Sequence, residues 1–372
     1  MKDGNTNAAL GAARALGAHG DPNLLRSSER GVPALLQALR YPDRRVKFAA
    51  AEAALAINSK GEPFDGSSRV VEVLKYAAGG NGKGKILVGL GNTDEANRLA
   101  DHLRNLKYDV EVIGSGRKLM EVAGNDGNVA LVITDASLPQ PGFSYFLSQF
   151  KHQPNTAGLP MLLIAEGSQA RLASDELAKS ANVKIISSAP KSPELLQAEV
   201  VGMIGDKTKP AFTDADRAAQ AKAAVDALAR MAKGELANFD LKHADPALLK
   251  AVNDEALAAS AATALAYRPS REAQAALAAA VLSDKLTPAT RTAIAASLRA
   301  HIHRFGNHLN QDQVKSLLSL ALSSKDGALR EQADLIASTL RGDPSVIGNR
   351  LKGFVPSSTP PATKVEPGKE GN

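Results

Sequence analysis

The chain has 372 residues, 44% of them hydrophobic and 23% charged, which is enough for two or three globular domains with cores of their own. It has no cysteine, which excludes disulfides, thiolate nucleophiles and zinc sites with cysteine ligands. The net charge is +6, with a slightly acidic centre over residues 85–206 between slightly basic flanks, and this spread lacks the basic stripe of nucleic-acid-binding proteins.

No apolar run approaches the length that spans a bilayer. The first residues, Met1 to Asn5, also lack the hydrophobic segment of a secretory signal. We therefore expect a soluble cytoplasmic protein that has no contact with a membrane.

Residues 1–79 have the periodicity of paired helices. A weak pattern over residues 7–18 predicts a first helix. A second has four apolar residues on one face: Val32, Leu35, Leu36 and Leu39. Pro42 ends it, because the residue before a proline disfavours the α conformation. A further helix is predicted from Arg44 to about Ile57.

The start of that last helix, residues 43–53 (DRRVKFAAAEA), resembles the second helix of bacterial HEAT-like repeats. In that family an aspartate is followed by a basic residue, valine, arginine or lysine, an aliphatic residue and two alanines. The resemblance implies that residues 1–79 form antiparallel helix pairs that stack on one another. The basic residues Arg44, Arg45 and Lys47 could contact phosphate. No aromatic residue is interleaved with them, so we expect a solvated helix face.

The glycine-rich residues 80–84 predict a linker, after which the period changes. Five aliphatic runs are predicted as strands, at residues 86–88, 110–113, 130–133, 161–164 and 183–186. They alternate with five predicted helices, at residues 94–106, 118–123, 143–150, 169–179 and 193–204. This alternation predicts a doubly wound α/β domain over residues 85–205, with ligand chemistry at the carboxyl ends of its strands.

Residues 131–139 (LVITDASLP) resemble the phosphoacceptor segment of response-regulator receiver domains, in which an aliphatic strand leads to an aspartate, two residues, an aliphatic residue and a proline. Residues 189–195 (APKSPEL) resemble the family's Lys-Pro-x-x-Pro-Glu-x-Leu after the fifth strand. The resemblance covers about a third of the chain. It implies a flavodoxin-like receiver fold with Asp135 as the candidate phosphoacceptor.

The other residues of receiver chemistry are replaced. The family places an acidic pair after the first strand to hold a divalent cation, whereas residues 88–92 (VGLGN) have no carboxylate. The family's lysine is matched by Ala189, with Lys191 nearby, and its Thr or Ser by Ala165, followed by Glu166. Phosphoryl transfer between two anions needs that cation. We therefore expect a pseudo-receiver with no catalytic residue, metal or cofactor, in which Asp135 is a strand-end turn residue that accepts local backbone hydrogen bonds.

Gly89-Leu90-Gly91 is a weak dinucleotide-binding pattern. Asp94 stands where the third glycine of the fingerprint would be, and its charge opposes a pyrophosphate at a helix N-terminus. We read Asp94 as an early helix acid, with Thr93 as a cap.

Residues 206–212 predict a second linker, and residues 213–345 a HEAT-like helical block. Its predicted helices lie at residues 218–233, 246–252, 255–266, 271–282, 288–303, 311–322 and 329–340. His301, His303 and His308 are close in sequence, but the first two point about 200° apart on a helix, so we expect helix-end or surface side chains rather than metal ligands. Residues 346–372, rich in proline and polar residues, predict a disordered tail.

The sequence thus predicts a non-enzymatic scaffold or signalling protein that binds protein partners and no small-molecule substrate. By resemblance to receiver pairs, residues 169–179 and 193–204 are candidates for a partner contact. Three alternatives stay open: phosphorelay through Asp135, nucleic-acid binding by the basic repeats, and a lyase activity known among some HEAT-like relatives, for which no site is seen. Whether the two helical blocks form one solenoid is also open.

Overall fold

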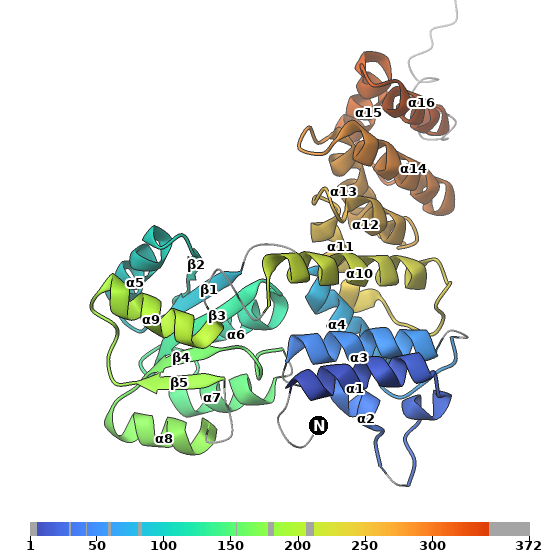
Figure 1. Cartoon of the computed structure of the whole chain (residues 1–372). Helices are drawn as coiled ribbons and strands as arrows, with labels where there is room; N and C mark the ends of the chain where they lie inside the picture. The colour runs from blue at the N-terminus through green and yellow to red at the C-terminus, as the bar shows by residue number, and fades with distance from the viewer. Residues whose placement is uncertain are drawn as a thin grey trace, which may run out of the picture.

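The computed structural model describes residues 6–29, 31–41, 43–58, 61–80, 84–153, 155–177, 182–205 and 212–341 (Figure 1). Within them the chain is mostly helical and contains one five-stranded parallel sheet, so an α/β domain lies among helices. The predicted tail at 346–372 and nearly all of the predicted linker at 206–212 lie outside the described residues, as do residues 81–83 of the first linker. No helix in the described part of the chain is both long and apolar enough to cross a membrane.

The first helices of the chain are α1 Thr6–His19, a 3₁₀ turn Pro22–Leu25, α2 Ala34–Ala38, α3 Arg44–Ile57 and α4 Ser67–Ala78. Helix α3 begins where predicted, because the side chain of Asp43 accepts a hydrogen bond from the amide of Arg45 and caps it. Helix α2 is shorter than predicted, and Val32 precedes it and is exposed. The sequence did not single out α4, whose three valines favour strands as much as helices.

The α/β domain contains strands β1 Lys85–Gly89, β2 Asp109–Val112, β3 Val129–Asp135, β4 Met161–Ile164 and β5 Val183–Ile186. All five were predicted, and they lie in the order β2-β1-β3-β4-β5 with every neighbouring pair parallel. The helices between and after them are α5 Thr93–Asn105, α6 Gly116–Asn125, α7 Phe143–His152, α8 Gly167–Leu177 and α9 Pro193–Ile204. The cap of α5 is the side chain of Asn92, which accepts from the amides of Asp94 and Glu95, so the prediction of Thr93 is wrong by one residue.

The two faces of the sheet are covered by different helices. Side chains of α5 and α9 pack with Ile86 and Ile133 on one face. Side chains of α6, α7 and α8 pack with Leu87 and Val132 on the other. Residues that follow one another along β1, and along β3, therefore point to opposite faces of the sheet. This alternation is the normal pleat of a strand, here covered by helices on both sides.

The last helices are α10 Asp214–Ala232, a 3₁₀ turn Lys242–Ala244, α11 Asp245–Ala251, α12 Ala258–Leu265, α13 Arg271–Leu282, α14 Pro288–Phe305, α15 Gln311–Ser323 and α16 Gly327–Arg341. Every helix predicted in this block is present. The two helical blocks share one hydrophobic core, in which Val70 and Leu74 of α4 belong to the same cluster as Val225 and Leu228 of α10. We call α1–α4 and α10–α16 together the helical array.

The sequence left open whether the two helical blocks are continuous with each other, and the structure shows that they are. The helices of the array follow one another from α1 to α16, and α10 continues it directly from α4 (Figure 1). The α/β domain is inserted between α4 and α10 and lies to one side of the array (Figure 1). Alanines of α3 and α10, among them Ala50, Ala221 and Ala224, are fully buried, and such small side chains let helices pack closely.

Candidate functional site

The carboxyl end of β3 carries the predicted phosphoacceptor. The two carboxylate oxygens of Asp135 accept hydrogen bonds from the amide of Gly91, at 3.1 and 3.2 Å. They also accept from the amide of Ser137 at 3.1 Å and from its hydroxyl at 2.8 Å. The Asp135 side chain thus ties the loop after β1 to the loop after β3, in agreement with the predicted turn residue.

Only glycine fits at position 91, because the loop after β1 approaches Ser137 closely where Asp135 joins the two loops. A Cβ at Gly91 would overlap the Ser137 hydroxyl and lie 2.5 Å from the Ser137 carbonyl oxygen. The close backbone approach that the Gly89-Leu90-Gly91 pattern allows is therefore made within the chain. No nucleotide needs to be invoked to explain the glycine.

The other predicted site residues reach the same edge of the sheet without touching Asp135. Ala165 is buried after β4, and its amide donates to the carbonyl of Ile186. Glu166 and Lys191 are exposed, in the loops after β4 and β5. Among the described residues, no hydrogen bond or ion pair joins either side chain to Asp135, and no three His, Asp or Glu side chains gather to hold a metal ion.

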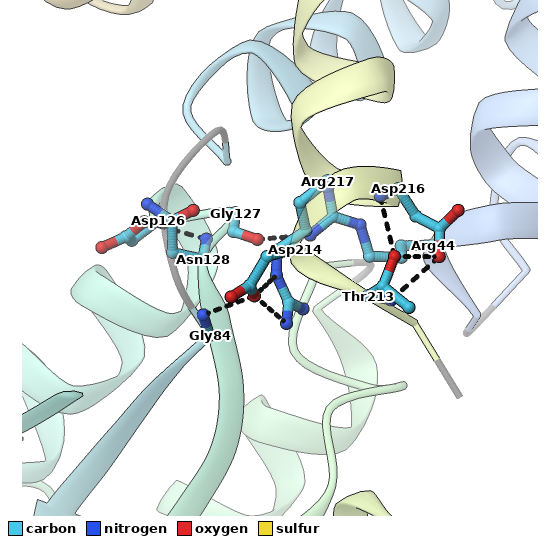
Figure 2. A network of polar contacts seen from close by, with 9 residues as sticks. All are labelled: Arg44, Gly84, Asp126, Gly127, Asn128, Thr213, Asp214, Asp216 and Arg217. Carbon is cyan, nitrogen blue, oxygen red and sulfur yellow. Dashed lines mark hydrogen bonds and ion pairs between the residues drawn. The ribbon is translucent and has the colours of Figure 1, made fainter. Parts of the chain in front are cut away.

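A second cluster lies at the opposite edge, where the strands begin and the α/β domain meets the helical array (Figure 2). Arg44 of α3 donates hydrogen bonds to the carbonyl of Gly127, just before β3, and to the side chain of Gln220 in α10, the latter at 3.3 Å. Asp214 of α10 accepts from the amide of Gly84, just before β1, at 3.0 Å. We call these contacts, together with the 3.0 Å ion pair between Asp214 and Arg217, the junction network.

On both sides of the junction network, the contacting residues make hydrogen bonds or ion pairs within their own part of the chain. Thr213 and Asp216 form a capping box that fixes the first turn of α10. On the sheet side, Asp126 accepts from the amide of Asn128 at 3.0 Å and pairs with Lys85 at 3.1 Å. These local bonds hold the contacting groups in place, and groups held in this way lose less entropy in a contact.

Two glycines allow the backbones to touch at this junction. A Cβ at Gly127 would overlap the carbonyl oxygen of Tyr76 and lie 2.9 Å from the Cα of Gly80. A Cβ at Gly80 would lie 2.7 Å from the carbonyl carbon of Gly127. Side chains at either position would push the α/β domain off the end of α4.

The basic residues that begin α3 do not form the predicted solvated face. Lys47 is only 3% exposed, Arg44 is partly buried, and Arg45 pairs with Asp43 at 2.8 Å. The prediction is wrong because α4, α10 and the α/β domain close over this turn. The same burial keeps the Lys47 side chain out of any solvated basic face.

Aromatic rings that are distant in sequence accompany these cations. The Arg44 guanidinium lies 4.6 Å from the ring centroid of Phe212 and 5.6 Å from that of Tyr76. The Lys47 ammonium lies 5.8 Å from the Tyr76 centroid, and Arg217 lies 5.4 Å from Phe212. These aromatic rings do not lie between the basic residues in the sequence: the fold supplies Tyr76 from α4 and Phe212 from the residue before the cap of α10.

Burial changes the ionisation of this cluster. Desolvation, helped by the nearby charge of Arg44, lowers the pKa of Lys47 to about 8. Desolvation is also the main reason that the pKa of Arg44 is lowered, with Arg217 adding to the effect. At neutral pH both groups still carry charge, so the junction holds several cations at an energetic cost.

His301 corrects the expectation of surface histidines. Its ring is fully buried, Nδ1 lies 2.9 Å from the Gln274 side-chain amide, and Nε2 lies 2.9 Å from the carbonyl of Arg268. Desolvation lowers its pKa. His303 and His308 are exposed, as expected. His301, on α14, is thus a structural residue that joins α14 to α13 and to Arg268 just before α13.

A comparison with known protein families found no family model that matches the chain, and a comparison with curated proteins found no significant match. The chemistry at the two edges of the sheet therefore has to follow from the residues themselves.

Proposed function

We propose that the protein is a non-enzymatic, cytoplasmic scaffold in which HEAT-like helical repeats hold a pseudo-receiver domain in a fixed orientation for protein partners. The observation that carries the proposal is the hydrophobic core that α1–α4 share with α10–α16, and the junction network attaches the α/β domain to these helices. Stacked helix pairs offer extended surfaces for protein recognition. A domain fixed on such an array presents both surfaces to one partner at once.

Two features support a receiver-like, flavodoxin-like origin for the α/β domain. The strand order β2-β1-β3-β4-β5 is the order of flavodoxin-like doubly wound sheets. Asp135 ends the central strand of that sheet, where receivers have their phosphoacceptor. Its carboxylate serves as a loop tie in this chain, which supports a receiver fold put to a structural use.

The partner surface that we propose combines α8, β5 and α9. Among the described residues, β5 is the last strand of the sheet and pairs with β4, so its other edge is open to pairing with a partner strand. Leu172 of α8 and Leu195 of α9 are exposed, the latter by 60%. An open strand edge and exposed apolar side chains are the two features that β-augmentation uses.

Photo-crosslinking in the cell of origin tests this surface. A benzoylphenylalanine at Leu195 is expected to capture one defined protein, and the same group at Arg98, an exposed position on α5, is expected not to. Introducing Ile185→Pro, which removes a backbone amide on the side of β5 that faces away from β4, should abolish the crosslink from position 195. Equal products from positions 195 and 98, or a crosslink that survives Ile185→Pro, would argue against a specific surface at β5.

Phosphorelay through Asp135 is the second candidate, favoured by the position of Asp135 at the carboxyl end of β3. Incubation with acetyl phosphate and Mg²⁺ followed by intact mass measurement separates the candidates. The pseudo-receiver proposal expects no added phosphoryl group. An adduct that Asp135→Asn removes would establish phosphotransfer and overturn the proposal.

A further inference from the structure

The end of α14 meets α13 through a hydrogen-bonded network that is buried in the helical array. Neither the His301 ring nor the Gln274 side chain that faces it has exposed surface. Nδ1 of His301 lies 2.9 Å from the side-chain nitrogen of Gln274, and Nε2 lies 2.9 Å from the carbonyl oxygen of Arg268. The Phe305 ring packs against the imidazole with centroids 4.8 Å apart. Both ring nitrogens are therefore held by the protein and not by solvent.

The orientation of the Gln274 amide is fixed by main-chain groups of the turn after α14. Its nitrogen donates to the carbonyl oxygen of Gly306 at 2.9 Å, and its oxygen accepts from the amide of His308. A carbonyl oxygen can only accept and a main-chain amide can only donate, so these two partners exclude the flipped side chain. The nitrogen of Gln274 therefore faces His301 as a donor.

These contacts assign the protonation state of His301. Nδ1 faces a donor, so it is the unprotonated nitrogen that accepts the hydrogen bond. Nε2 faces a carbonyl oxygen, so it carries the hydrogen and donates. The network is complete only when the imidazole is neutral. A charged imidazole has a second N–H at Nδ1, which points at the Gln274 nitrogen and finds no acceptor there.

The surroundings of His301 disfavour the charged ring. Desolvation is the main reason that its pKa is lowered, and the charges of His308 and Arg304 add to this effect. The hydrogen bond to the Arg268 carbonyl acts in the opposite direction but does not reverse the shift. The geometry and the electrostatics therefore agree that acid works against this network.

The helices around His301 supply no carboxylate to the network. α14 itself has no acidic residue, and α12, which packs against it, has no ionisable one. On α13, Arg271 and Glu272 are exposed, and Asp245 of α11 is paired with Arg268 at 2.8 Å. The ionisable side chains that the structure describes on α15 and α16 are also exposed: Asp312, Lys315, Arg330, Glu331 and Asp334.

We propose that His301 and Gln274 form an acid-sensitive latch between α13 and the turn at residues 306–308. Protonation of Nδ1 sets two donors against each other, so Gln274 has to rotate or withdraw. Either movement breaks its bonds to Gly306 and His308, which tie that turn to α13. The turn leads into α15, so its release loosens α15 and changes the surface that this end of the array presents. Helices far from the latch stay folded, because stacked helix pairs contact mainly their neighbours.

The latch responds to a fall in pH. The folded pKa of His301 lies below the ordinary value of 6.5, so the closed latch has its full stability above about pH 6.5. As the pH falls from there, the open form binds a proton that the closed form does not. The equilibrium constant for opening then rises by at most about tenfold per pH unit, until the folded pKa is reached.

Ring ¹⁵N NMR of histidines in the full-length wild type tests the assignment without any substitution. We expect His301 to have a hydrogen on Nε2 and none on Nδ1 at pH 7.5, and to titrate below pH 6.5. A hydrogen on Nδ1, or titration at or above pH 6.5, would overturn the latch. In Gln274→Glu, a carboxylate faces Nδ1 and should raise the pKa of His301.

Hydrogen exchange at pH 7.5 and pH 5.5, corrected for the intrinsic effect of pH on exchange, measures the opening. Amides of residues 306–314 should lose up to about tenfold in protection at pH 5.5, while those of α3 keep theirs. His301→Gln, which cannot be charged, should remove this pH dependence. His303→Gln, at an exposed position of the same helix, is the control and should retain it. Unchanged protection in the wild type, or the same pH dependence in His301→Gln, would refute the proposal.

Discussion

The guanidinium of Arg44 in α3 donates a hydrogen bond to the main-chain carbonyl of Gly127 in the loop before β3. This bond joins residues that are 83 positions apart and crosses from the helical array to the α/β domain. It lies at the edge of the sheet opposite to Asp135. The two ends of the strands therefore differ: where the strands begin, the sheet docks on the helical array, and at their carboxyl ends Asp135 ties two loops together.

The Arg44 bond should stabilise docking measurably. Arg44→Met is expected to lower the free energy of unfolding by about 1–3 kcal/mol, because the Gly127 carbonyl loses a charged donor. Hydrogen exchange should also increase in residues 125–129. Arg98→Met, at an exposed ion pair on α5, is the control and should change stability by less than about 0.5 kcal/mol. Unchanged exchange at residues 125–129 would show that Arg44 does not hold the junction.

The glycine contact at the junction should be intolerant of a methyl group. Gly127→Ala is expected to cost at least about 2 kcal/mol of stability, since the added Cβ overlaps the Tyr76 carbonyl and cannot move without displacing α4. The matched control is Gly202→Ala in α9, where nothing lies within 4 Å of the new Cβ. That variant should gain about 0.5–1 kcal/mol from helix propensity in urea unfolding. Equal effects of the two substitutions would refute the contact.

The Lys47 charge should make stability depend on pH. Its pKa falls from 10.5 in the unfolded chain to about 8 in the folded protein. Between these values the unfolded chain binds the proton that the folded protein has lost, so stability rises with pH over this window and is flat with respect to this group below it. The rise is at most about 3 kcal/mol.

Lys47→Met should abolish this contribution, while Asp43, Arg44, Arg69 and Tyr76 around it stay the same. Denaturant unfolding of both proteins from pH 7 to pH 11, in buffer without phosphate, measures the difference between them. A difference that does not change with pH would mean that Lys47 is not desolvated as the structure has it.

The Asp135 tie should be stabilising. Asp135→Ala is expected to lower the free energy of unfolding by about 1–3 kcal/mol, because the amides of Gly91 and Ser137 lose their acceptor. Asp175→Ala, at an exposed residue of α8, provides the control. An aspartate kept only for phosphorylation could be removed with little loss of stability, so a neutral result for Asp135→Ala would favour phosphorelay.

The shared core should make the two helical blocks unfold together. Leu228→Ala in α10 is expected to cost about 2–5 kcal/mol, as for other buried leucines. Hydrogen exchange should then accelerate in α4 as well as in α10. Leu322→Ala, at an exposed residue of α15, should leave both unchanged. Acceleration restricted to α10 and the helices after it would show two independent blocks.

The sequence by itself determined the secondary structure of the α/β domain and of the C-terminal helices. The strands are short continuous aliphatic runs and the helices repeat apolar residues with period 3.6, and both signals depend only on neighbours along the chain. It also predicted the local backbone hydrogen bond that Asp135 accepts from Ser137 at the end of β3, but not the bond from Gly91, which is 44 positions away. It missed α4, whose valines are neutral between strand and helix until the helix packs against α10.

Only the tertiary structure decided that the helices form one array, that Lys47 and His301 are buried, and that Arg44 meets Gly127, Phe212 and Gln220. The last of these partners is 176 positions away in sequence. Such contacts leave no periodic trace, because burial of a charged side chain depends on which distant surfaces close over it. The basic turn of α3 therefore appears solvated in the sequence, whereas in the folded protein Lys47 is buried and Arg44 and Arg45 are partly buried.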